Sequence, residues 1–129
     1  MSTTWTNWGR NQTCHPAQVA VPRDVDELAA TVAGASAAGT RVKAVGSGHS
    51  FTPVATTDGV QVRLDHLSGV LTADAVTGRV TVGAGTPLHV LNPALQALGL
   101  ALPNLGDIDR QTISGAIATG THGSGARYQ

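Results

Sequence analysis

The sequence predicts an α+β fold made of two α/β subdomains, residues 1–67 and residues 68–129. The first half places a helical pattern between two short apolar segments, an order that is typical of parallel strand pairs. The second half is more antiparallel, because two alternating segments flank a Thr77-Gly78 turn and predict a hairpin. The 41% of apolar and 12% of charged residues indicate a globular chain rather than a disordered one.

The first half begins its regular structure with a strand at 19–21, which Pro22 closes. Asp24 and Glu27 form a capping-box pattern, so we expect a helix that starts there and ends at Gly39. Alternating polar and apolar residues then predict two more strands, at 41–45 and 60–64, separated by a loop that begins at Gly46.

The second half starts with the hairpin strands 70–74 and 79–82. Thr86 and Pro87 are typical of an N-cap followed by the first helical residue, and Gly99 suits the stop. Between them, four leucines share one face: Leu88, Leu91, Leu95 and Leu98. Pro93 predicts either a kink in this helix or a restart with Asn92 as a new cap. A short helix of small residues is expected at 112–118.

Composition excludes several classes of function. The net charge is zero and aromatic residues are only 3%, so the chain offers neither phosphate neutralisation nor base stacking for nucleic acid. Cys14 is the single cysteine, which rules out an internal disulfide and a cysteine metal site. The N-terminus lacks the pattern of a signal peptide and no apolar run is long enough to span a bilayer, so we expect a cytoplasmic protein without a transmembrane segment.

The loop Gly46-Ser-Gly-His-Ser50 is the first candidate site. Its two glycines allow consecutive backbone N–H groups to face one concavity that can hold an anion, although a plain tight turn would read the same way. It is not a Walker loop, and Phe51 stands where a Rossmann fingerprint needs its third glycine. Thr52 likewise replaces a glycine of the nucleophile-elbow pattern, so Ser50 is not expected to be a hydrolase nucleophile.

A second glycine-rich segment, residues 115–125, contains His122. His49 and His122 differ from the other three histidines because both lie in loops that a ligand can approach. No two histidines share metal-ligand spacing, so we expect no metal site, but the two loops alone leave a metal, a flavin or no ligand open. The hydroxyls of Thr119 and Thr121 can bond a phosphate or a flavin edge. Two such loops could grip one extended dinucleotide, whereas a glycine-rich hinge is the structural alternative.

Four motifs in order give the chain a resemblance to a known family: Asn7-Trp-Gly9, Val45-Gly-Ser-Gly-His-Ser-Phe51, Gly99-Leu-Ala-Leu-Pro-Asn104 and Ala118-Thr-Gly-Thr-His-Gly-Ser-Gly125. They resemble the N-terminal region of the aldonolactone oxidoreductases and alditol oxidase, in the vanillyl-alcohol oxidase superfamily with its PCMH-type FAD-binding domain. The likeness is greatest to the actinobacterial branch that acts on L-gulono-1,4-lactone.

The resemblance implies FAD as the cofactor, bonded covalently through the 8α carbon of the flavin to His49. It implies that the surrounding loop contacts the pyrophosphate through Gly46, Ser47, Gly48 and Ser50. The second FAD-contacting stretch would comprise Thr112, Gly115, Thr119, Gly120, Thr121 and His122. Asp107 stands where the family often has serine near the flavin, and we keep it as a candidate cofactor contact that could also turn outward.

The implied activity is hydride transfer from a sugar-1,4-lactone of gulono, galactono or arabinono type to flavin N5, followed by reoxidation by dioxygen or another acceptor. The alternatives are an alditol oxidase acting on a xylitol-type polyol and a truncated, non-catalytic binding or structural remnant. Family members continue into a substrate domain, so we expect this chain to be the N-terminal part of a longer polypeptide. No catalytic acid or base can be named in it, and the 129 residues alone are expected to oxidise no substrate.

Overall fold

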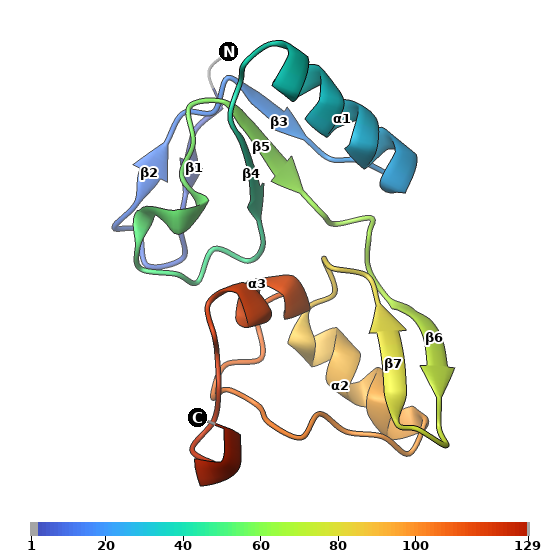
Figure 1. Ribbon diagram of the computed structural model, residues 1–129. Coiled ribbons are helices and arrows are strands. Elements are labelled where there is room, and N and C mark those ends of the chain that lie inside the picture. The colour runs from blue at the N-terminus through green and yellow to red at the C-terminus, as the bar shows by residue number, and fades with distance from the viewer. Residues whose placement is uncertain (1–2, 129) are drawn as a thin grey trace. The chain divides into compact units, whose positions relative to one another are not determined.

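A computed structural model describes residues 3–128, which form two compact units divided between Leu67 and Ser68 (Figure 1). Each unit has its own group of buried apolar side chains. The chain combines helices with one parallel sheet and two antiparallel hairpins, which confirms the predicted α+β class.

The first unit is built on a parallel sheet of β3 (Gln18–Ala20), β4 (Val42–Val45) and β5 (Val60–Arg63). Its strand order is β3-β5-β4, so β3 and β4 are parallel, as the strand–helix–strand pattern predicts, but β5 lies between them. The helix α1 (Val25–Ala37) connects β3 to β4. Ala35 of α1 packs with Val60 and Val62 in the small core of this unit.

The start of α1 confirms the predicted capping box. The Asp24 side chain accepts a hydrogen bond from the Glu27 backbone N–H at 2.8 Å. Glu27 reaches back to the N–H of Arg23, also at 2.8 Å, one residue earlier than the usual capping box would place it. At the other end Gly39 has φ +62°, a left-handed conformation that glycine adopts without strain.

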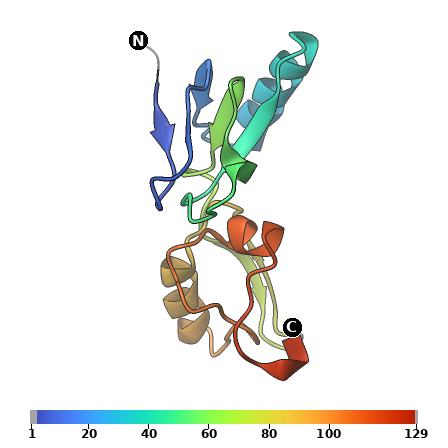
Figure 2. The same cartoon turned by 90° about the vertical axis from the view of Figure 1, so that its left-hand side faces the viewer.

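A hairpin of β1 (Trp5–Thr6) and β2 (Thr13–Cys14) completes the first unit. We did not predict it, because strands of two residues are too short to show an alternating pattern. In Figure 2 the hairpin and α1 lie on opposite sides of β4 and β5. A single 3-10 turn, η1 (Pro53–Ala55), lies between β4 and β5.

The second unit begins with the antiparallel hairpin of β6 (Val70–Asp74) and β7 (Arg79–Val82), as predicted, with Gly78 at φ +68° in the turn. Two helices follow, α2 (Leu88–Ala97) and α3 (Ile113–Ala118), and a 3-10 turn, η2 (Ala126–Tyr128), comes last. Three of the predicted leucines are buried with Ala116 and pack against apolar side chains of the hairpin: Leu88, Leu91 and Leu95.

The predicted start of α2 was wrong by one residue. Pro87 has ψ 145° and is itself the N-cap, while Thr86 is buried outside the helix. The Thr86 hydroxyl donates to the carbonyl of Gly83 and accepts from the N–H of Gly69, so it joins the hairpin to the helix instead of capping the helix. The helix then continues through Pro93, so the predicted restart at Asn92 does not occur.

Candidate functional site

The His49 loop, residues 46–52, leaves the sheet directly after β4. Val45, the last residue of β4, is buried and anchors the loop, whereas Gly46 and Ser47 are exposed. Gly48 turns the chain with φ +72°, and a Cβ placed on it would lie 3.1 Å from the Trp5 ring. In the described part of the chain, the backbone N–H groups of residues 47–49 have no hydrogen-bond partner. Neighbouring N–H donors without a partner suit an anionic group such as a phosphate.

The turn of the β1–β2 hairpin holds this loop from the other side. Asn7 is 3% exposed, and its amide Oδ1 accepts from the N–H groups of Asn11 at 3.1 Å and Gln12 at 3.0 Å. Its Nδ2 donates to Asn11 Oδ1 at 2.8 Å and to the carbonyl of Ser50 at 2.9 Å. Since an amide has two donors and two acceptor lone pairs, these four bonds use its full capacity.

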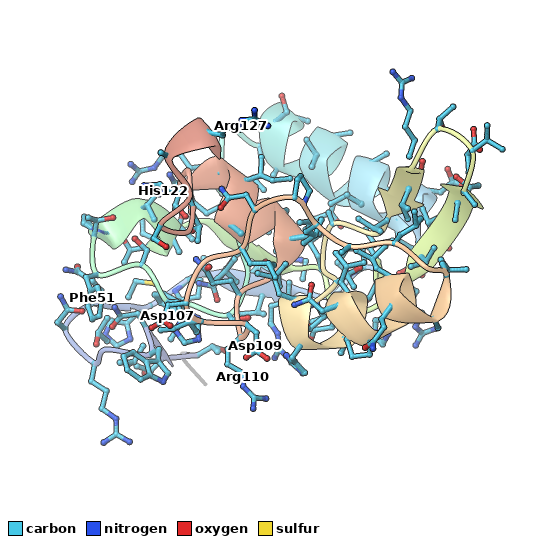
Figure 3. All side chains as sticks on the ribbon, turned by 90° about the horizontal axis from the view of Figure 1, so that it is seen from below. Phe51, Asp107, Asp109, Arg110, His122 and Arg127 are labelled. Atoms are coloured by element: carbon cyan, nitrogen blue, oxygen red, sulfur yellow. The ribbon has the colours of Figure 1, made fainter. Side chains whose placement is uncertain are left out.

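Two aromatic rings accompany His49. The Trp8 indole stacks on the His49 imidazole with 5.2 Å between ring centroids and an interplanar angle of 26°. Its other neighbour is Phe51, which it meets edge-on at 6.4 Å, and both Trp8 and Phe51 are 62% exposed. Phe51 is labelled in Figure 3. His49 itself is half-buried, so its ring is supported on one side and still open to a ligand.

Ser50 directs its hydroxyl along the loop. The Oγ of Ser50 lies 2.9 Å from Oγ1 of Thr52, and it accepts a long hydrogen bond of 3.4 Å from the Thr52 N–H. This local pairing explains how Ser50 is held in the bend, and it is unlike the partnership with histidine that a serine nucleophile needs.

In the second unit the candidate residues surround α3. Thr112 caps this helix by accepting from the N–H of Gly115 at 3.3 Å, which confirms the predicted short helix. After the helix, Thr119 donates to the carbonyl of Gly115 at 2.9 Å and lies 3.3 Å from the Thr121 hydroxyl. Gly120 between them has φ +60°, which allows the chain to reverse there.

Glycines let the segment after α3 lie against residues 104–106. A Cβ on Gly106 would lie 2.6 Å from the Thr121 methyl, and one on Gly123 would lie 2.3 Å from the carbonyl oxygen of Leu105. The Gly123 N–H donates to Asn104 Oδ1 at 2.8 Å. Two backbone segments are therefore in direct contact, at a separation that only glycine permits.

The side chains of His122 and Asp107 are both exposed in this region (Figure 3). His122 Nδ1 lies 2.8 Å from the carbonyl oxygen of Gly123, the next residue. A pocket of about 280 Å³ lies within the second unit, and its lining includes Gly106 and Thr121, the chain neighbours of Asp107 and His122. It is lined largely by small and apolar residues, among them Leu102, Ile113, Ala116, Ile117, Gly120 and Thr121.

The chemistry of the His49 loop suits an anionic ligand. No group of three or more histidine, cysteine, aspartate or glutamate side chains is placed to hold a metal ion among residues 3–128. Unpaired backbone donors in the His49 loop suit a phosphate, and the imidazole of His49 supplies a nucleophilic nitrogen. Within the described residues, no helix is long and apolar enough to cross a membrane.

Apart from Asp107, which precedes α3, the predicted residues fall into two sets, each within one unit. Residues 46–50 share the loop after β4, and residues 112–122 share α3 and the turn behind it. Sequence reasoning noted the Asn7-Trp-Gly9 motif but not what it does. The structure shows that Asn7 and Trp8 contact the His49 loop directly.

Comparison with known proteins identifies the fold. Residues 16–129 match the family described as "FAD binding domain". The chain belongs to this family. Its structure also resembles the crystal structure of cholesterol oxidase from B. sterolicum, with a TM-score of 0.82. The match covers 96% of this chain and 24% of that protein. At 24% identity this likeness concerns the fold alone.

The curated relatives are longer oxidoreductases. The FAD-binding domain chain is 49% identical over its whole length to L-gulono-1,4-lactone dehydrogenase of Mycobacterium tuberculosis, of which it covers 30%. It is 39% identical to L-gulonolactone oxidase of Bos taurus, with 95% of this chain and 28% of that protein aligned. It is 42% identical to alditol oxidase of a Streptomyces species, and the alignment covers 97% of this chain and 30% of that protein. The chain is thus a FAD-binding region homologous to sugar-lactone oxidoreductases, and it spans about 30% of the length of these relatives.

Proposed function

We propose that this chain is the flavin-holding part of an oxidoreductase that oxidises a sugar-1,4-lactone of gulono, galactono or arabinono type. The observation that carries the proposal is the loop of residues 46–52, in which unpaired N–H donors adjoin a histidine that stacks on the Trp8 ring. The FAD-binding family and the lactone-oxidising names of two relatives support the reaction class. Bound FAD supplies the hydride acceptor, and the chain supplies its placement.

The two units offer different kinds of contact to FAD. In the first unit, the backbone of residues 47–49 offers N–H donors to a pyrophosphate, and Ser50 shapes the bend. In the second unit, the hydroxyls and backbone around α3 offer contacts to the cofactor through Thr112, Gly115, Thr119, Gly120, Thr121 and His122. Asp107 is exposed and available as a further contact.

His49 is the proposed point of covalent attachment. The imidazole of His49 would hold the flavin through one of its nitrogens, and this link would replace one N–H bond of the ring and one C–H bond of the 8α methyl group. The two electrons and two protons released would go to dissolved dioxygen, which would become hydrogen peroxide. The linked chain is therefore heavier by one FAD less two hydrogen atoms. The half-buried, stacked imidazole supports this assignment, since its position is set while one side stays open.

An alditol such as xylitol is the second candidate substrate, and the 42% identity to an alditol oxidase favours keeping it. Either substrate presents a C–H bond on a hydroxyl-bearing carbon, so this chain can serve both reactions with the same residues. The electron acceptor after substrate oxidation would be dioxygen or another oxidant.

The test is reduction of the flavin in the polypeptide as its native source makes it. Under anaerobic conditions, L-gulono-1,4-lactone and xylitol are each mixed with the protein while flavin absorbance is followed. We expect the lactone to bleach the flavin faster than xylitol does. Faster bleaching by xylitol would instead support the alditol reaction, and bleaching by neither would contradict the proposed activity. A matched assay of residues 1–129 alone should show no turnover.

A further inference from the structure

The two backbone carbonyls that flank His49 are both fixed by consecutive residues of the β1–β2 turn. Gly48 O accepts from the backbone N–H of Trp8 at 2.9 Å, and Ser50 O accepts from the Asn7 side chain at 2.9 Å. The next carbonyl, at Phe51, accepts from Asn11 Nδ2 at 2.9 Å and Gln12 Nε2 at 3.1 Å. The peptide groups around His49 are thereby held from outside the loop.

With its backbone held, His49 keeps freedom only in its side-chain torsions. Trp8 restricts these, because its indole lies nearly parallel to the imidazole at a centroid distance of 5.2 Å. Offset stacking of two rings at this distance favours one ring plane over the others. The same residue therefore holds the loop through its backbone and the imidazole through its side chain.

The indole is in turn set by its surroundings. Phe51 meets Trp8 edge-on, and the Phe51 ring lies so close to Gly9 that a Cβ there would be 2.8 Å from it. Arg10 has φ +56°, which non-glycine residues seldom adopt, and it closes the tight turn that brings Asn7 and Asn11 together. Trp8 remains 62% exposed, so little of the first unit's core depends on its side chain.

We propose that Asn7 and Trp8 are positioning residues that orient the His49 imidazole for covalent attachment of FAD. This inference rests on the proposed function. Asn7 sets the loop backbone and Trp8 sets the ring plane, so that a nitrogen of His49 is presented to the 8α carbon in one orientation. Because a covalent step depends steeply on how the reacting atoms are oriented, loss of either constraint slows the attachment.

The experiment measures attachment and not substrate turnover. The full polypeptide is prepared without flavin, FAD is added, and samples are denatured at intervals for intact mass. The variants are Trp8→Ala, Trp8→Phe and Asn7→Asp, with Val25→Ala as the matched control, since Val25 is an exposed apolar residue of the same unit. The affinity for FAD without the covalent bond is measured in parallel, by equilibrium titration of the same variants combined with His49→Ala.

We expect Trp8→Ala to slow the mass gain about threefold to tenfold, the effect of losing one aromatic pair. Trp8→Phe should recover most of the rate, because a phenyl ring still stacks. Asn7→Asp keeps the oxygen acceptors but loses both N–H donors, so the Ser50 carbonyl is released and attachment slows further. Val25→Ala should match the wild type, and FAD affinity in the His49→Ala background should change less than twofold with Trp8→Ala.

Two failures are distinguishable. Attachment at the wild-type rate in Trp8→Ala would overturn the positioning role. Slower attachment that is fully explained by a loss of folded protein or of FAD affinity would overturn it as well. Neither result would contradict the covalent bond between His49 and the flavin. A wild-type chain that gains no mass would overturn both this inference and the covalent part of the proposed function. If Asn7→Asp fails to fold, Trp8→Ala decides alone.

Discussion

Replacing Gly123 by alanine should destabilise the second unit strongly. The added Cβ would lie 2.3 Å from the carbonyl oxygen of Leu105, about 1.1 Å short of the 3.4 Å at which ordinary contact begins. The clash is with backbone, so no side-chain rotation relieves it. Residues 104–106 and 123 must separate, and the hydrogen bond from the Gly123 N–H to Asn104 Oδ1 at 2.8 Å is then lost.

The size of the effect follows from these two losses. Overpacking in a closely packed region costs about 1–3 kcal/mol, and a lost hydrogen bond adds about 1 kcal/mol. We expect the free energy of unfolding to fall by about 2–4 kcal/mol, a large part of the roughly 5–15 kcal/mol of a typical protein. Gly34→Ala is the matched control, because a Cβ on Gly34 meets nothing within 4 Å inside α1. That change should stabilise the protein by about 0.5–1 kcal/mol.

Urea unfolding of the purified chain, followed by circular dichroism, measures both variants. Hydrogen exchange of peptides that cover residues 104–123 locates the change, and faster exchange there is expected in Gly123→Ala. An unfolding free energy of Gly123→Ala within about 0.5 kcal/mol of the wild type, the range of a neutral surface substitution, would refute the reasoning from the close backbone contact.

Three further predictions concern local bonds. Asp24→Ala should cost about 1 kcal/mol in urea unfolding, because it removes the α1 cap, whereas Asp26→Ala on the same exposed turn should not. Thr86→Val should cost about 1–3 kcal/mol, since it leaves the half-buried Gly69 N–H and the buried Gly83 carbonyl without their partner, and equal stability would contradict that role. In the hairpin turn, the pKa of Asp74 lies below its ordinary value of 3.8, because the carboxylate accepts hydrogen bonds. The largest effect comes from the Thr77 hydroxyl, followed by the backbone N–H groups of Thr77 and Val76. The ionised Asp74 therefore stabilises the fold above pH 3.8, and this contribution is lost as pH falls through the lower folded value, so Asp74→Ala should flatten the acid side of the stability profile.

The helices and the hairpin were predictable because their signals are local. Asp24 and Glu27 are neighbours in sequence and in space, and Gly39 and Gly78 stand where the chain needs a positive φ. Thr86 carried an equally good capping signal, yet tertiary bonds to Gly69 and Gly83 took its hydroxyl. A local pattern predicts a cap only when no distant partner competes for the same side chain.

The non-local parts of the fold were beyond sequence reasoning. The insertion of β5 between β3 and β4 depends on pairing between Val19, Gln61 and Lys43, which no local pattern encodes. The role of Asn7 depends on a hydrogen bond to a residue 43 positions away. The residues of the His49 loop, by contrast, could be grouped from the sequence alone, because they are consecutive in the chain.

The most direct test of the central claim is the denatured intact mass of the protein from its native source, compared with His49→Ala. The account predicts a mass increased by one FAD less two hydrogen atoms in the wild type, and no such increase in the variant. A wild-type polypeptide without added mass, or a variant that keeps it, would contradict His49 as the attachment point.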